Sequence, residues 1–159
     1  MQITSDVQAQ VCIYLENENK LISKHRDSAA LQKDNNANLT IDNATNTTPG
    51  TLTVQTYFTD YSKSGFGAGI GSGFGNVSSG SCSNITINGG SVNASSTNGT
   101  DIGSGRAAFL TGRRGSCSNI TISGGSVNAK NIGCIPHQTL DSAGNYNPDS
   151  PRSVSLHHS

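Results

Sequence analysis

The stretch that decides the fold is GSCSNITINGGSVNA, residues 80–94, because it returns almost unchanged as GSCSNITISGGSVNA at residues 115–129. Fourteen of the fifteen positions are identical, only Asn88 becomes Ser123, and the offset is 35 residues. Self-similarity at a fixed period of about 20–50 residues is the signature of a repeat protein. The rest of the chain is therefore interpreted as further copies of one unit.

Weaker copies precede this pair. NLTID at 38–42 is followed by GTLTV at 50–54, and CIYL at 12–15 is followed by KLI at 20–22. A third short element closes each unit; its versions are AAL at 29–31, AGIG at 68–71, DIG at 101–103 and NIG at 131–133. Each unit thus holds three short alternations of apolar and polar residues. Such alternation is typical of half-buried strands.

None of these strands can bury its apolar face alone, and stacking the units solves this problem. Stacking places Ile85 over Ile120, Ile87 over Ile122, and Val92 over Val127. The sequence predicts an all-β fold, a single-stranded right-handed parallel β-helix (a solenoid) of about four coils of three short strands over residues 1–134. We expect Ile, Val, Leu and Ala inside, and corners with positive φ at the glycine pairs 89–90 and 124–125. Residues 135–159 are expected to form a C-terminal cap or a loose tail.

The composition excludes several classes of protein. Lys plus Arg and Asp plus Glu number 10 each, so no cationic excess is present for binding nucleic acid. No run of about 18 apolar residues occurs, so no insertion into a membrane is expected. Gly, Ser, Thr and Asn make up almost half of the chain, which disfavours a helical bundle.

Two insertions and the outward columns are the candidate binding residues. The first insertion is rich in aromatic residues and the second in arginine, and insertions in solenoids often form the binding surface. The candidates are Tyr57, Phe58, Tyr61, Phe66, Arg106, Arg113, Arg114, Thr86, Asn93, Thr121 and Asn128. The aromatic residues either form a platform for a glycan or cover an open side of the helix. The Thr and Asn columns either contact a ligand or bond to one another along the stack.

The chain has four cysteines, at positions 12, 82, 117 and 134. Cys82 and Cys117 hold the same place in adjacent copies, so stacking brings their Cα atoms to about 4.8 Å, a distance that a disulfide can span. The alternative is a pair of buried free thiols that act as small apolar side chains. No Cys-x-x-Cys occurs, and neither a metal site nor a cofactor is expected.

The carboxylates do not indicate catalysis. Parallel β-helices also serve as scaffolds of polysaccharide lyases, which cluster several acids. In this chain only Asp42 and Asp101 fall within well-formed coils, and they lie on different strands. No pair of acids with the spacing of a glycosidase is identifiable. The expectation is therefore a protein that is not an enzyme.

The segments IYLEN, AALQK, NLTI, GAGIGSG and SNITINGGSVNA carry a family resemblance. Over roughly residues 3–134 the chain resembles the glycine-rich repeat β-helix domains of surface proteins from gut bacteria, which are labelled carbohydrate-binding. It departs mildly from their pattern in GAGIGSG and SVNA. The resemblance implies an extracellular β-helix that binds a glycan, and its matching residues are scaffold residues.

Together these observations predict a non-catalytic extracellular binding module for a polysaccharide, a surface glycan or a host surface. The alternatives are the structural stalk of an adhesin without a ligand, a lyase-like β-helix, or an ice-binding β-helix with a flat Thr array. Residues 1–4 do not begin a signal peptide. The expectation is therefore a segment of a longer, secreted or cell-surface chain with neighbouring domains.

Overall fold

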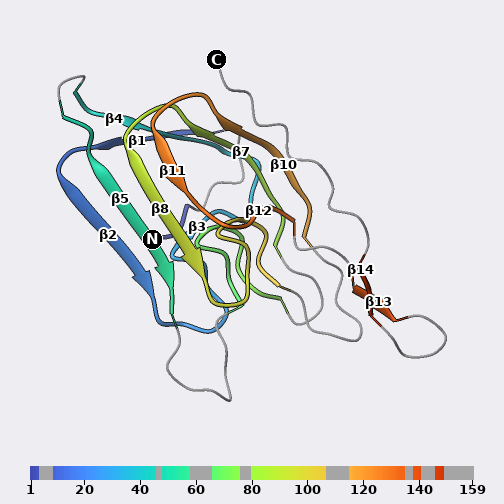
Figure 1. Ribbon diagram of the computed structural model, residues 1–159. Helices are drawn as coiled ribbons and strands as arrows, with labels where there is room; N and C mark the ends of the chain where they lie inside the picture. The colour runs from blue at the N-terminus through green and yellow to red at the C-terminus, as the bar shows by residue number, and fades with distance from the viewer. Residues whose placement is uncertain are drawn as a thin grey trace.

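The computed structural model describes residues 1–3, 9–45, 48–57, 66–75, 80–106, 115–134, 138–140 and 146–148. Within these ranges the chain forms strands, turns and bends and no helix. Three parallel sheets of four strands each build a β-helix of four coils with three short strands per coil (Figure 1). The predicted fold is therefore confirmed.

Each coil contributes one strand to each sheet. The first sheet contains β1 (Gln10–Leu15), β4 (Asn38–Asn43), β7 (Cys82–Ile87) and β10 (Cys117–Ile122). The second contains β2 (Glu18–Ser23), β5 (Thr51–Thr56), β8 (Ser91–Ser96) and β11 (Ser126–Asn128). The third contains β3 (Leu31–Gln32), β6 (Ile70–Gly71), β9 (Ile102–Gly103) and β12 (Ile132–Gly133). An antiparallel hairpin of β13 (Gln138–Leu140) and β14 (Tyr146–Pro148) follows the last coil.

The register places equivalent residues of successive units on top of one another. The predicted pairs are all present: Ile85–Ile120, Ile87–Ile122 and Val92–Val127. Ile85 and Ile87 are fully buried, and Ile120 and Ile122 remain 7% and 8% exposed on the last coil. Each fully buried aliphatic side chain contributes about 1.5–3 kcal/mol. The continuous rows of branched residues therefore supply the cohesion between coils.

The third sheet has a glycine column. Gly71, Gly103 and Gly133 have φ values of 134°, 138° and 110°, which L side chains rarely adopt. A Cβ on Gly71 would lie 1.9 Å from the carbonyl oxygen of Gly103, and a Cβ on Gly103 would lie 1.9 Å from that of Gly133. Successive coils approach so closely here that no side chain fits. At the predicted corners, by contrast, only the second glycine of each pair, Gly90 or Gly125, has positive φ.

Asp101 ties the third coil to the fourth. Its side chain is almost fully buried, at 4% exposed. One carboxylate oxygen accepts a hydrogen bond from the backbone N–H of Ser96, and the other accepts from those of Lys130 and Asn131. Three N–H donors compensate the buried charge, so this carboxylate has a structural role.

Residues 1–3 extend the third sheet at the N-terminal end. Gln2 forms a parallel bridge with Gln32, and the N-terminal ammonium donates to the carbonyl of Ala30 at 3.0 Å. Ile3 is buried against the core. This added segment covers an edge of the first coil that would otherwise present unpaired backbone groups.

Candidate functional site

The first sheet carries a backbone irregularity at Asn84 and Asn119. Their φ values are 58° and 52°, in the left-handed region that Asn tolerates better than most residues. Cys82 and Ile85 are both buried although they are three positions apart. The strand therefore bulges between them, and Ser83 and Asn84 face outward together. The same happens one coil later in β10.

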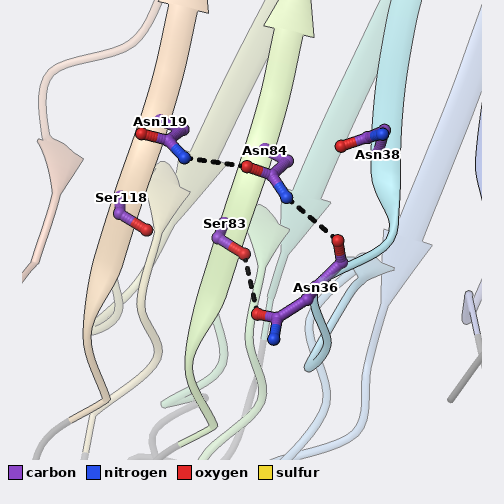
Figure 2. A pocket seen from close by; sticks show the side chains of 6 residues that line it. All are labelled: Asn36, Asn38, Ser83, Asn84, Ser118 and Asn119. Atoms are coloured by element: carbon purple, nitrogen blue, oxygen red, sulfur yellow. Dashed lines mark hydrogen bonds between the residues drawn. The ribbon is translucent and has the colours of Figure 1, made fainter. Parts of the chain in front are cut away.

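These outward side chains line a polar groove of about 380 Å³ (Figure 2). The lining residues are Asn36, Asn38, Ser83, Asn84, Ser118 and Asn119. Asn36 belongs to the bend before β4, and the other five lie near the starts of β4, β7 and β10. None of the six carries a charge, and every one can both donate and accept hydrogen bonds.

Hydrogen bonds hold the amides of the groove in a row. The amide of Asn119 donates to the side-chain oxygen of Asn84 at 2.9 Å, and the amide of Asn84 donates to the backbone carbonyl of Asn36 at 2.9 Å. The hydroxyl of Ser83 donates to the side-chain oxygen of Asn36 at 3.0 Å. This network holds the side chains of Ser83, Asn84 and Asn119 in one arrangement.

Some polar groups of the groove stay open. Within the described part of the chain, neither the side-chain amide of Asn38 nor the hydroxyl of Ser118 has a hydrogen-bonding partner. Figure 2 shows Asn38 in line with Asn84 and Asn119, and Ser118 beside Ser83. Donors and acceptors are thus available along the groove at spacings set by the coils.

Lys33 lies beneath the groove and was not anticipated from the sequence. Its side chain is 0% exposed. The ammonium donates to the backbone carbonyl of Asn35 at 2.7 Å and to that of Ser83 at 2.5 Å. Desolvation lowers the pKa of Lys33 from its usual value of 10.5, and attraction to Cys82 offsets only part of this effect. Lys33 thereby supports two backbone segments that border the groove.

Three thiols also lie under this surface. The Sγ atoms of Cys82 and Cys117 are 3.2 Å apart, and the backbone N–H of Cys117 donates to the Sγ of Cys134 at 2.9 Å. All are free thiols in the structure. The pKa of Cys117 is raised from 9.0 to about 12: hydrogen bonds with Cys134 and Ser104 lower it, but the hydrogen bond with Cys82, burial and the electrostatic interaction with Cys82 together outweigh them.

The predicted Thr and Asn columns are present but lie outside the groove. Thr86 pairs with Thr121 on the first sheet, and Asn93 pairs with Asn128 on the second. The amide of Asn128 donates to the side-chain oxygen of Asn93 at 3.5 Å, the outer limit of a hydrogen bond. Asn93 and Asn128 thus bond to one another along the stack, whereas Thr86 and Thr121 are aligned in register.

The structure brings some of the predicted aromatic and arginine residues together. The Phe66 and Phe74 rings are 5.0 Å apart, and the Arg26 guanidinium lies 5.3 Å and 5.5 Å from their centroids. Arg106 lies 5.9 Å from the Phe66 centroid. Tyr57 is 47% exposed. Phe58, Tyr61, Arg113 and Arg114 lie outside the described residues.

None of the six residues that line the groove is among the candidate binding residues named from the sequence. The signal for the bulge was present, because Cys82 and Ile85 are both apolar but three positions apart, and an Asn stands between them. The position of Asn36 depends on a bend outside the repeat. No sequence pattern indicated that bend.

Comparison with protein-family models, curated proteins and solved structures found no match to this chain. Among the described residues, no group of three or more His, Cys, Asp or Glu side chains is arranged to hold a metal ion. The same part of the chain contains no helix long and apolar enough to cross a membrane.

Proposed function

We propose that this protein is a non-catalytic, extracellular binding module that holds an uncharged, hydroxyl-rich glycan in the groove of the first sheet. The observation that carries the proposal is the row of amides at Asn38, Asn84 and Asn119 with hydroxyls beside it. Amides and hydroxyls match sugar hydroxyls, because both partners donate and accept. An uncharged lining favours a neutral ligand over an anionic one.

The chemistry of the groove supports binding rather than catalysis. Its six lining side chains include no group that titrates near neutral pH. The two acids of the well-formed coils are engaged elsewhere, since Asp101 accepts three backbone hydrogen bonds and Asp42 accepts one from the N–H of Asn43. General acid–base chemistry would need a titratable group within reach of the ligand.

The resemblance to surface proteins of gut bacteria supports the proposed ligand class and compartment. A segment of a longer secreted or cell-surface chain, flanked by other domains, would present the groove to glycans of a host or of the cell's own surface. The cluster of Arg26, Phe66, Phe74 and Arg106 is a second surface that such a ligand could contact.

Binding is tested on an array of immobilised neutral polysaccharides, followed by calorimetry with each hit. The variant N84G/N119G removes both amides and keeps the positive φ, which glycine adopts freely. Losing about two hydrogen bonds of about 1 kcal/mol each should weaken binding about 30-fold. The matched control N93S/N128S removes the amide pair of the second sheet and should leave the affinity unchanged.

Two results would overturn the assignment. Binding to no polysaccharide would remove the glycan proposal and leave the stalk of an adhesin, for which the hydrogen-bonded ladder of Asn93 and Asn128 is the supporting observation. Binding that survives N84G/N119G but is lost in Tyr57→Ala would move the ligand away from the groove.

A further inference from the structure

The two thiols under the groove hold equivalent positions in the two near-identical repeats. Cys82 and Cys117 are register partners on neighbouring parallel strands, and each comes directly before the Ser–Asn pair that lines the groove. Neighbouring strands lie about 4.8 Å apart, within the Cα spacing that disulfides use. The Sγ atoms are already in contact at 3.2 Å. A disulfide bond holds its sulfurs about 2.05 Å apart, so the two Sγ atoms have to approach by about 1.2 Å more.

We infer that Cys82 and Cys117 form a cross-linking site, at which a disulfide ties the third coil to the fourth directly beneath the groove. The inference is independent of the proposed glycan binding, because it rests on the thiols alone. A bond here would fix the spacing between the Asn84 and Asn119 amides, since each follows its cysteine by two positions.

The oxidant is a low-molecular-weight disulfide, such as oxidised glutathione. One protein thiolate attacks this disulfide, which gives a mixed disulfide and releases one small thiol. The second protein thiol then attacks the protein sulfur of the mixed disulfide and releases the second small thiol. The two cysteines lose two electrons and two protons in total, and the small disulfide takes them up as two thiols.

The other cysteines are placed less well for this bond. Cys12 is exposed on β1 of the first coil, where its register partner is Thr40 of β4. Strand β1 lies two strands away from β7 in the sheet. The Sγ of Cys134 lies against the backbone of Cys117, where it accepts from the N–H and donates to the carbonyl oxygen at 3.9 Å. The side chains of Cys82 and Cys134 both interact with the Cys117 thiol, and the Sγ of Cys82 lies 3.2 Å from that of Cys117. Cys134 is therefore the competitor that an experiment must separate.

Tryptic mapping of the full chain separates all candidates, because each cysteine falls on its own peptide. Cys12 lies in 1–20, Cys82 in 64–106, Cys117 in 115–130 and Cys134 in 131–152. The protein is incubated with oxidised glutathione, its remaining thiols are alkylated, and it is digested without reductant. With its pKa at about 12, Cys117 holds little thiolate at neutral pH, so the incubation is run overnight at about pH 8.5.

We expect a peptide that joins 64–106 to 115–130, lighter by two hydrogens than the sum of its parts, and a loss of two of the four free thiols. Cys134→Ser should keep this product, and Cys82→Ser and Cys117→Ser should each abolish it. The cross-link should raise Tm by about 5–10 °C, reversibly on reduction. A bond between 115–130 and 131–152, or glutathione adducts without a cross-link, would overturn the inference.

Discussion

The first and third sheets are built from the same four units but meet their neighbours in opposite ways. In the third sheet, the Ile-Gly strands bring successive backbones so close that a Cβ on Gly103 would lie 1.9 Å from the oxygen of Gly133. In the first sheet, the bulges at Asn84 and Asn119 turn side chains outward and leave a groove of about 380 Å³.

The difference shows how one repeat can separate close packing between coils from an outward polar surface. The third sheet accepts no side chain at its glycine column, so its sequence is fixed by the distance between coils. The first sheet keeps the interior row of Ile85 and Ile120 and leaves the bulged positions free for polar groups. Substitutions at the two sheets should therefore have very different consequences.

The largest effect is expected in the third sheet. Gly103→Ala places a methyl group against backbone atoms at a φ of 138°, and both overpacking and backbone strain oppose it. We expect a loss of about 4 kcal/mol in the free energy of unfolding, measured by urea denaturation. The matched control Ser118→Ala, at an exposed position of the first sheet, should stay within about 0.5 kcal/mol of the wild type. Equal stability of the two variants would show that the coils do not approach so closely.

A smaller effect is expected at the bulge itself. Asn84→Ala should cost about 1–2 kcal/mol more than Asn84→Gly, because both variants lose the amide but only alanine resists a φ of 58°. The two unfolding curves in urea provide the comparison. If alanine and glycine are equally stable at position 84, the left-handed bulge is absent in solution and the groove loses its basis.

The smallest effect concerns Lys33, which follows β3 of the third sheet and donates to Ser83 in the first. Burial lowers its pKa below 10.5, so between its folded pKa and 10.5 the folded state binds fewer protons than the unfolded state. The stability of the wild type relative to Lys33→Met should therefore rise with pH through this window. It should not vary with pH below the window.

Denaturation curves at several pH values between 7 and 10.5 measure this difference. Lys20→Met, at an exposed position of the second sheet, serves as the matched lysine variant. Identical pH profiles of the wild type and Lys33→Met would contradict the buried position of the ammonium.

The sequence predicts the fold because the repeat carries its own register. Two copies that match at fourteen of fifteen positions can align in only one way, and that alignment places Ile85 on Ile120 and Val92 on Val127. The Ile-Gly element also revealed the third sheet. The close approach of its glycines was not predicted, because a contact between backbones leaves no pattern of apolar side chains.

The groove and its support could be predicted only in part. The Asn84 and Asn119 column follows from the repeat, but the bulge requires that Cys82 and Ile85 both turn inward, which overrides strict alternation. Lys33 was unexpected because a charged side chain is rarely buried. One of its carbonyl partners, Ser83, is 50 positions away in the sequence, and the other, Asn35, lies in a bend. Such partners become visible only when the coils are assembled.

Asn84 and Asn119 are 35 residues apart, which is one repeat unit. The number of amides along the groove therefore depends on the number of repeat units in the chain. Duplicating residues 80–114 within the gene would insert one more coil and lengthen the row of amides by about 4.8 Å without any new packing problem. Near-identical neighbouring segments also recombine readily. If the proposed glycan binding holds, a lineage could therefore change the number of contacts with a polymeric glycan in whole steps, by gaining or losing coils.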